Sequence, residues 1–388
     1  MIQMKIKTFL TLTALTVVAM LSVTMIGQRI GPKPKRPMTR MSPSLTCTTT
    51  KGFNTNMILT TTEQQYIQPY LTKLKLYQDN CGSQAFSSMM IFTSMPTDPA
   101  AIAQESVRIS NILTAMSKIG IKPIIIAEPG KLSFIEFNQR SFDKYLSEFF
   151  ISLKANGVTD QMMGLWVPFP EPNIPVWNSI GSNPTMIAQN FNIYMEALRE
   201  TFPTVKGSIL LNSKSFAPED VNWESGQYSS LAEYGSSLNP AYLDSVGIQG
   251  FPWIGPKGTE WGYDKSAETF LQPELTIELA QAAGVKKVWF NTGSFSSKYT
   301  LDPAKTVIIP NIERATTLNS ILITSVQVRS ALGKDSKVML HIFAEDKSQV
   351  AEATNWSFSN TQELNMLKNF IIQANKFGFE TGFFDIAK

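Results

Sequence analysis

Short apolar runs alternate with amphipathic stretches from residue 54 to the C-terminus. Most of these runs are continuously apolar, which is the pattern of parallel strands that are covered on both faces. The runs that we interpret as candidate strands are residues 56–60, 87–93, 122–128, 162–167, 207–213, 245–251, 286–291, 337–343 and 380–386.

The stretches between the runs place apolar residues at helical spacing. The segments "TDP" at 97–99 and "SNPT" at 182–185 are N-cap signals with a proline in the first turn. A glycine in "IGIKP" and another in "AGVKK" are placed to end a helix just before a strand. The predicted helices are residues 99–119, 139–155, 184–202, 271–283, 311–332 and 361–376.

Repeated strand–helix units of this kind predict a parallel α/β fold. We expect a single-domain (β/α)8 TIM barrel over residues 51–388, with a long insertion at 214–244. No glycine-rich phosphate loop follows the first strands, which argues against a nucleotide-binding doubly wound sheet. Nine candidate strands compete for eight places, so either 56–60 or 380–386 is extra, and that choice sets the strand numbering.

The N-terminal segment has the composition of a targeting sequence. Two lysines precede an uncharged run from Thr8 to Gly27, which is long enough to span a bilayer as a helix. We expect a signal peptide or a signal anchor over residues 1–27, followed by a basic, Pro-rich linker over residues 28–50. More Lys and Arg follow the run than precede it, which opposes export, but an apolar run ahead of an enzyme-sized body favours it. The prediction is therefore an extracellular or cell-surface protein that meets the membrane only through this segment.

Charge and residue counts exclude several classes of function. Residues 1–40 carry seven basic and no acidic residues, so the net charge of +3 leaves about −4 for the remainder. A mildly acidic body lacks the electrostatic footprint of a nucleic-acid-binding protein. His341 is the only histidine and fits a packing role, so a zinc site or a histidine-based triad is disfavoured and no cofactor is expected. Cys47 and Cys81 form either a disulfide or two free thiols. We expect the protein to be a monomer.

One strand ending stands out, the sequence "WVPFPEPN" at 166–173. It places Glu171 between two prolines at the end of an apolar run. In a TIM barrel, chemistry lies where strands end and the following loops begin. The other strand ends supply carboxylates, amides and tryptophans, which suit a sugar because apolar sugar faces stack on aromatic rings and hydroxyls bind to polar side chains. The candidate substrate-binding residues are Trp166, Asn173, Glu128, Asn212, Trp253, Trp289 and Asn291.

Glycoside hydrolysis requires two carboxyl groups that flank the scissile bond, about 5–5.5 Å apart in retaining enzymes and about 6.5–9.5 Å apart in inverting ones. Glu171 is the candidate proton donor, because burial by aromatic residues and prolines would raise its pKa. Glu345 is the candidate second carboxylate, with the N-terminal charge of a following helix or loop as its alternative role. Two structural alternatives also stay open: that Trp166 and Trp289 are core aromatics, and that Glu128 and Asn291 are turn residues.

The same residues resemble a known family, the β-mannanase-like enzymes of glycoside hydrolase family 26. Their acid/base strand is usually written W-R-P-F-H-E-M-N, and matching places hold Trp166, Pro168, Phe169, Glu171 and Asn173. Weaker likenesses cover the rest of residues 120–295, in "KPIIIAEPG", "FDKYLSEFFISLKANG", "YLDSVGIQGF" and "KKVWFNTGSF". The resemblance implies a retaining (β/α)8 glycosidase with its acid/base after the fourth strand, which would be Glu171, and its nucleophile after the seventh.

Four positions depart from the family pattern. Val167 stands for the arginine, Pro170 for the histidine, Phe251 for the tyrosine and Asn291 for the nucleophilic glutamate. An amide cannot form a glycosyl-enzyme ester, so three explanations are open: a shifted alignment with Glu345 as the partner, an inverting mechanism, or loss of catalysis.

The strand numbering bears directly on the first explanation. If 87–93 is the first barrel strand, 337–343 is the seventh and Glu345 takes the nucleophile's place, but Glu171 then follows the third strand.

The sequence therefore favours a glycoside hydrolase-like protein of the endo-β-glycanase type, acting on a polysaccharide or oligosaccharide. The alternative is a catalytically inactive glycan-binding barrel protein at the cell surface. An unrelated barrel or surface structural protein is the third interpretation, because barrels support many functions.

Overall fold

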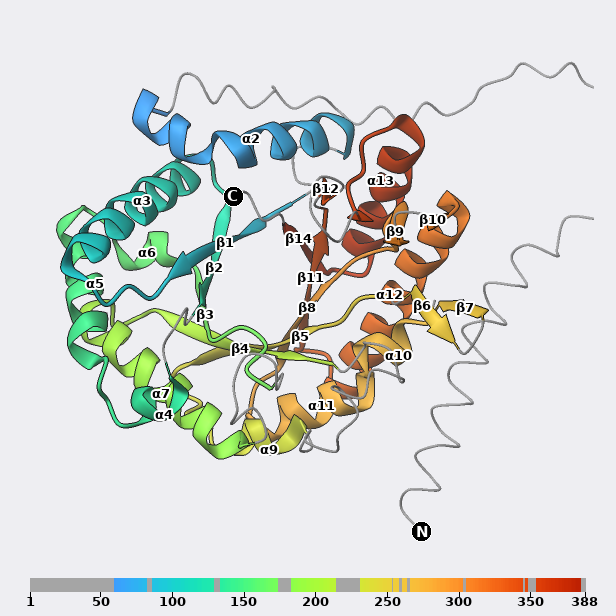
Figure 1. The fold of residues 1–388 in the computed structure, drawn as a ribbon. Helices are drawn as coiled ribbons and strands as arrows, with labels where there is room; N and C mark the ends of the chain where they lie inside the picture. Colours follow the sequence, from blue (N-terminus) through green and yellow to red (C-terminus); the bar gives the residue numbers. More distant parts are fainter. Residues whose placement is uncertain are drawn as a thin grey trace, which may run out of the picture. The chain divides into compact units, whose positions relative to one another are not determined.

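The protein folds as a closed barrel of eight parallel strands surrounded by helices, so the predicted (β/α)8 barrel is confirmed (Figure 1). The strand order around the barrel is β1-β14-β11-β8-β5-β4-β3-β2. The computed structural model describes residues 59–81, 86–128, 133–173, 183–213, 231–252, 254–257, 260–263, 266–302, 305–344, 346–347 and 354–384.

The barrel strands agree closely with the apolar runs of the sequence. They are β1 (Ser88–Ser94), β2 (Lys122–Glu128), β3 (Leu165–Pro168), β4 (Lys206–Asn212), β5 (Leu243–Gln249), β8 (Lys287–Thr292), β11 (Lys337–Phe343) and β14 (Glu380–Phe384).

The helices follow the predicted periodic stretches, with α2 and several short helices in addition. They are α2 (Thr61–Cys81), α3 (Pro99–Lys118), α4 (Phe134–Asn138), α5 (Asp143–Ala155), α6 (Asp160–Met163), α7 (Pro184–Thr201), α9 (Leu231–Ser236), α10 (Ala267–Leu271), α11 (Pro273–Ala282), α12 (Asn311–Leu332) and α13 (Thr361–Lys376). Within the part of the chain that is described, none of these helices is long and apolar enough to cross a membrane.

The barrel settles the strand numbering. β14 pairs with both β1 and β11 and closes the barrel, so the run at 380–386 is the eighth strand. The run at 56–60 is the extra one, since its described residues, Leu59 and Thr60, precede α2 and lie outside the sheet. Placing Glu171 after the fourth strand is therefore wrong. Glu171 follows the third strand, Asn291 ends the sixth, and β11 is the seventh.

Helix α2 was not predicted, although its start is encoded locally. The backbone N–H of Thr60 donates to Glu63 Oε2 at 2.9 Å, and the N–H of Glu63 donates to Thr60 Oγ1 at 3.2 Å. This reciprocal pair is a capping box, whose T-x-x-E signature is readable in "TTTE". Lys73 in α2 donates to the carbonyl of Ala344 at 3.3 Å, so the helix is tied to the end of the seventh strand.

Side chains fill the barrel interior, as expected for a packed core rather than a pore. Trp289 is fully buried, and its Nε1 donates to Ser208 Oγ at 2.7 Å. Gly247 on the neighbouring strand makes room for the indole, because a Cβ there would lie 2.3 Å from Trp289 Cε2. His341 is also fully buried, with Nε2 2.9 Å from Ser88 Oγ.

Trp166 lies on the outer face of β3, opposite to the face that lines the barrel interior. Its ring packs edge-on against Phe150 of α5, with centroids 5.6 Å apart, and lies 6.1 Å from the ring of Tyr194 of α7. Its strand neighbours Leu165 and Val167 belong instead to the apolar cluster inside the barrel. Trp166 is therefore a core residue between the barrel and the helices, and its predicted place at the substrate site is not where the structure puts it.

Three small hairpins decorate consecutive strand-to-helix loops on one side of the barrel. They follow β5, β8 and β11, and consist of β6 (Ile254–Lys257) with β7 (Glu260–Tyr263), β9 (Lys298–Asp302) with β10 (Lys305–Ile308), and β12 (Asp346–Lys347) with β13 (Thr354–Asn355).

Candidate active site

Glu171 is held by a tight turn that spans its two neighbouring strands. The backbone N–H of Phe169 donates to the carbonyl of Ala127 on β2 at 3.0 Å, and that of Glu171 donates to the carbonyl of Leu210 on β4 at 2.8 Å. Phe169 and Glu171 both have left-handed backbones, with φ of 55° and 51°. Such conformations cost about 1 kcal/mol or more in non-glycine residues and persist where the surroundings impose them. The turn is therefore a fixed feature of the barrel mouth.

Aromatic packing supports this turn from outside the barrel. The Phe169 ring is buried and lies 5.0 Å from the ring of Phe134 and 4.8 Å from that of Phe137, centroid to centroid. Both partners belong to α4. The sequence "FPE" thus sends its aromatic residue into the helical layer and leaves the carboxyl group at the mouth.

Asn173 and Asn212 fasten the end of the turn to the fourth strand. Asn173 Nδ2 donates to the carbonyl of Asn212, and the backbone N–H of Asn212 donates to Asn173 Oδ1, each at 2.8 Å. The two residues are fully buried. This pair of bonds uses the Asn173 side chain for structure and leaves the Asn212 side chain to face Glu171.

Three amide side chains from consecutive strands form a hydrogen-bonded chain that begins at the carboxyl group. Asn212 Nδ2 donates to Glu171 Oε1 at 2.6 Å. Gln249, at the end of β5, forms a second side-chain hydrogen bond with Glu171. Asn291, at the end of β8, donates from Nδ2 to Gln249 Oε1 at 2.5 Å. Asn212, Gln249 and Asn291 are named the amide cluster below.

The surroundings of Glu171 favour its protonated form. Burial raises the pKa of the Glu171 carboxyl, while the hydrogen bonds from Asn212 and Gln249 oppose that rise by stabilising the carboxylate. Among the described residues, no basic side chain forms an ion pair with Glu171. A carboxyl group whose pKa is raised by burial, and which accepts hydrogen bonds from neutral amides, is suited to hold and release a proton.

The other half of the mouth is aromatic. The rings of Phe251, Phe343 and Trp356 form a triangle with all three centroid distances between 5.5 and 5.6 Å. We name these residues the aromatic triangle. They pack on the apolar cluster inside the barrel, and Phe251 and Trp356 stay partly exposed. Phe251 lies two residues beyond Gln249, so the triangle adjoins the amide cluster.

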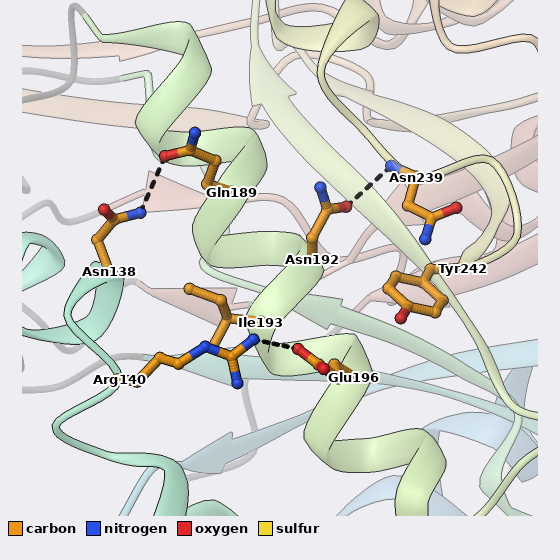
Figure 2. A pocket seen from close by; sticks show the side chains of 8 residues that line it. All are labelled: Asn138, Arg140, Gln189, Asn192, Ile193, Glu196, Asn239 and Tyr242. Carbon is orange, nitrogen blue, oxygen red and sulfur yellow. Dashed lines mark hydrogen bonds and ion pairs between the residues drawn. The ribbon is translucent and has the colours of Figure 1, made fainter.

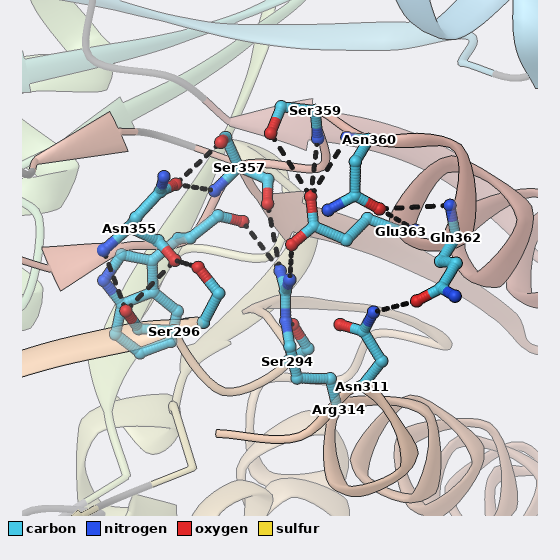
Figure 3. Close-up of polar contacts among 12 residues, drawn as sticks. Ser294, Ser296, Asn311, Arg314, Asn355, Ser357, Ser359, Asn360, Gln362 and Glu363 are labelled. Carbon is cyan, nitrogen blue, oxygen red and sulfur yellow. Dashed lines mark hydrogen bonds and ion pairs between the residues drawn. The ribbon is translucent and has the colours of Figure 1, made fainter. Parts of the chain in front are cut away.

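A buried arginine fixes the loop that carries Trp356, and Figure 3 shows its contact with Glu363. Arg314 of α12 is fully buried and pairs with Glu363 of α13 through a 2.6 Å contact between Nη1 and Oε1. Its other nitrogens donate to carbonyl oxygens of Phe295 at 3.0 Å and of Ser357 at 3.0 Å. These bonds link the loop after β8 to the loop after β11, which carries Trp356.

The two loops are also joined directly to each other. The backbone N–H of Ser297 donates to the carbonyl of Asn355 at 2.7 Å, and the N–H of Asn355 donates to Ser296 Oγ at 2.8 Å. The rim over the sixth and seventh strands is therefore one connected structure.

The structure brings together only part of the predicted site. Asn212 bonds Glu171 directly, Asn291 reaches it only through Gln249, and Asn173 supports the turn. Trp289 is fully buried one layer below the mouth and its Nε1 is already bonded to Ser208 Oγ, so it belongs to the barrel core. Glu128 ends β2 with an exposed side chain, paired in register with Ser94. The remaining two, Glu345 and Trp253, lie outside the described residues.

The sequence places Gln249 at a strand end, but neither Gln249 nor Trp356 is among its candidate site residues. Gln249 could have been found from its position in "VGIQGF", since the small Gly247 and then Gln249 share the inward face of β5. Trp356 gave no such signal, because it belongs to a loop and its place depends on the Arg314 contacts.

A separate hollow lies on the outer helical layer (Figure 2). It has a volume of about 360 Å³, half of its lining residues are amides, and Arg140 and Glu196 form an ion pair in it. Asn192 Oδ1 accepts from the backbone N–H of Asn239 at 2.9 Å. The polar groups of this hollow largely bind each other or the backbone.

In the described chain, no group of three or more His, Cys, Asp or Glu side chains is placed to hold a metal ion.

Comparison with known proteins supports the fold. No protein-family model matches the chain, and no curated protein sequence matches it. Solved structures do match it. The family 1 β-glucosidase from Thermotoga maritima superposes with a TM-score of 0.54 at 11% identity, covering 82% of this chain and 88% of that one. The complex of this enzyme with deoxynojirimycin superposes with a TM-score of 0.53 at 11% identity, covering 80% of this chain and 87% of that one.

The structure of another protein shows a similar degree of likeness. The virulence factor SghA in complex with its substrate analogue salicin matches with a TM-score of 0.54 at 12% identity, covering 82% of this chain and 86% of that one. At such low identity the likeness establishes the barrel architecture alone. These neighbours give no support for the family 26 resemblance in particular.

Proposed function

We propose that this protein is a glycosidase-like enzyme that acts on a polysaccharide or oligosaccharide, with Glu171 as general acid/base. The observation that carries the proposal is the partly buried Glu171 carboxyl, which among the described residues is hydrogen-bonded to neutral amides, at the C-terminal mouth of a (β/α)8 barrel. In support, chemistry in this fold is located at that mouth, and structural neighbours include β-glucosidases.

Glu171 would supply a proton to the glycosidic oxygen as the bond to the sugar breaks. Burial raises the pKa of this carboxyl, which favours the protonated form that a general acid needs. The amides of Asn212 and Gln249 would stabilise the carboxylate that forms after transfer. In a second step the carboxylate would accept a proton from water, which restores the starting state.

Glu345 remains our candidate for the second carboxylate. In the chain it stands two residues beyond Phe343, where the seventh strand ends, and the family resemblance implies a nucleophile after that strand. If it acts as nucleophile, it forms the glycosyl ester; if it acts as base, it activates water on the opposite face of the sugar. With Asn291 on the sixth strand, its amide no longer occupies the nucleophile's place.

The aromatic triangle and the amide cluster would share the binding of the sugar. The exposed parts of Phe251 and Trp356 offer an apolar face on which the C–H groups of a pyranose can stack. The amides offer donors and acceptors for its hydroxyls. We propose an endo-β-glycanase type of activity for this site.

A second candidate is a glycan-binding barrel without catalysis. The observation that favours it is that amides, rather than a second carboxylate, surround Glu171 among the described residues. We also propose export through residues 1–27, attachment to the membrane only through that segment, and a monomeric state.

Hydrolysis of a glycan panel separates the two candidates. The panel contains β-1,3- and β-1,4-linked glucans, mannan and xylan, and reducing ends are counted for the wild type, Glu171→Gln, Glu345→Gln and Glu128→Gln. We expect turnover of at least one glycan by the wild type, loss of turnover in the first two variants, and retention in Glu128→Gln. Binding of a glycan without turnover by the wild type supports the non-catalytic alternative.

A further inference from the structure

Asn291 occupies an unusual position in the amide cluster. Its side chain is fully buried at the end of β8, and its Nδ2 donates to Gln249 Oε1 at 2.5 Å. Its Oδ1 is buried and has no hydrogen-bond partner among the residues that the structure describes. An unpaired buried acceptor of this kind is destabilising unless a ligand or water supplies a donor.

The direction of the Asn291–Gln249 bond fixes the orientation of the Gln249 amide. Since Oε1 of Gln249 accepts from Asn291, its Nε2 is the group left to bond Glu171. An amide has distinct donor and acceptor ends, so reversing it would place an oxygen against the Glu171 carboxyl. The backbone holds both residues, because the N–H of Gly250 donates to the carbonyl of Asn291 at 3.1 Å.

We propose that Asn291 is a two-sided positioning residue: its Nδ2 orients the Gln249 amide so that Gln249 donates to Glu171, and its Oδ1 accepts the hydrogen of a hydroxyl group on the bound glycan. The first half concerns only the protein. The second half rests on the proposed function. Together they form a relay in which contact with one sugar hydroxyl reinforces the arrangement of the proton donor.

The charge environment makes the relay measurable. Among the described residues of the turn and of β4, β5 and β8, only burial and the amides of Asn212 and Gln249 shift the pKa of Glu171. No charged side chain contributes. Removing one donated hydrogen bond destabilises the carboxylate, so it raises the Glu171 pKa further.

A double-mutant cycle on the Glu171 titration tests the first half. The full-length protein carries glutamate labelled with ¹³C at the side-chain carboxyl, and the Glu171 signal is assigned by its loss in Glu171→Gln. We expect an upward shift of the Glu171 titration midpoint in Asn291→Ala, in Gln249→Ala and in Asn212→Ala. Thr292→Val is the matched control, since Thr292 is the next residue on β8 and its buried Oγ1 has no hydrogen-bond partner within the described part of the chain.

Additivity distinguishes a relay from independent effects. If Asn291 acts through Gln249, adding Asn291→Ala to Gln249→Ala produces no further shift, whereas adding it to Asn212→Ala does. A further shift in the Gln249→Ala background, or a midpoint in Asn291→Ala equal to that in Thr292→Val, overturns the first half.

Calorimetry with neutral oligosaccharides tests the second half. The probes are cellotetraose, mannotetraose and xylotetraose. For a probe that binds the wild type, we expect Asn291→Ala to weaken binding about tenfold, the equivalent of one hydrogen bond, and Asn291→Asp, which keeps an acceptor, to weaken it less.

The two halves can fail separately. Equal affinity of the wild type and Asn291→Ala for a bound probe overturns the second half alone. Binding of none of the probes overturns the second half together with the proposed function, while the titration still decides the relay.

Discussion

The side-chain amide of Asn212 donates to Glu171 Oε1 at 2.6 Å, so the end of the fourth strand orients the carboxyl group that the third strand supplies. The backbone of the same residue exchanges two hydrogen bonds with Asn173. One asparagine thus fixes both the turn and the direction of its carboxyl. The first prediction follows from this double role.

Replacing Asn173 with alanine should destabilise the fold. The change leaves the buried N–H and carbonyl of Asn212 without partners, which costs about 1–3 kcal/mol for each unsatisfied group. We expect the free energy of unfolding in urea to fall by about 2 kcal/mol or more. Asn111→Ala is the control, because that side chain binds only an exposed helix carbonyl and should change stability by less than about 0.5 kcal/mol. Equal effects of the two variants would contradict the role of Asn173.

The buried Arg314–Glu363 pair should be far more important for stability than surface pairs. Removing one partner leaves an uncompensated buried charge, which costs about 3–5 kcal/mol. We expect Glu363→Gln to lower the free energy of unfolding by that amount. Glu196→Gln, which breaks an exposed pair with Arg140, should cost about 1 kcal/mol or less. If the two substitutions prove equally mild, Arg314 does not organise the rim.

Gly247 should tolerate no side chain. A Cβ at this position would lie 2.3 Å from Trp289 Cε2, so Gly247→Ala forces the indole out of its packing. Overpacking of this kind costs about 1–3 kcal/mol. The matched change is Gly293→Ala, whose Cβ would meet its nearest neighbour, Phe343 Cβ, at 3.4 Å. A Gly247→Ala variant as stable as the wild type in thermal unfolding would show that the barrel interior has spare room.

His341 should make stability depend on pH. Burial first, and then the charges of Lys287 and Lys122, lower its pKa from 6.5 to about 3. Between these pH values the unfolded chain binds a proton that the folded chain excludes. The contribution is complete above about pH 6.5 and is lost as the pH falls toward 3, with a slope of about 1.4 kcal/mol per pH unit.

The measurement is urea unfolding of the wild type and of His341→Gln at pH 7, 5.5 and 4.5. We expect the wild type to lose stability more steeply than the variant, which cannot titrate at this position. Parallel pH dependences in the two proteins would contradict a neutral buried His341.

Local sequence patterns were sufficient to predict most of the fold. Continuous apolar runs marked the eight strands, and N-cap and glycine signals marked the helix ends. The strand number of Glu171 could not be read from these patterns. It depended on whether 56–60 or 380–386 joins the sheet, and that is decided by closure of β14 against β1. Pairing between distant strands is a tertiary property.

The sequence also did not show whether a given strand residue faces the barrel interior or the surrounding helices. Strands of a parallel barrel are apolar on both faces, so alternation gives no sign of which parity points inward. Trp166 therefore looked like Trp289, although one faces the helices and the other fills the barrel. Glu171 was identifiable because a lone carboxyl between prolines at a strand end has few structural reasons to be there.

The most direct test of Glu171 as general acid is its dependence on the leaving group. We would measure kcat/KM for the wild type and Glu171→Gln with a dinitrophenyl glycoside, whose leaving group needs no proton, and with a methoxyphenyl glycoside of the same sugar, whose leaving group does. The account predicts a loss of about 100-fold or more for the methoxyphenyl glycoside and a much smaller loss for the dinitrophenyl glycoside. Equal losses with both, or full activity of Glu171→Gln, would contradict it.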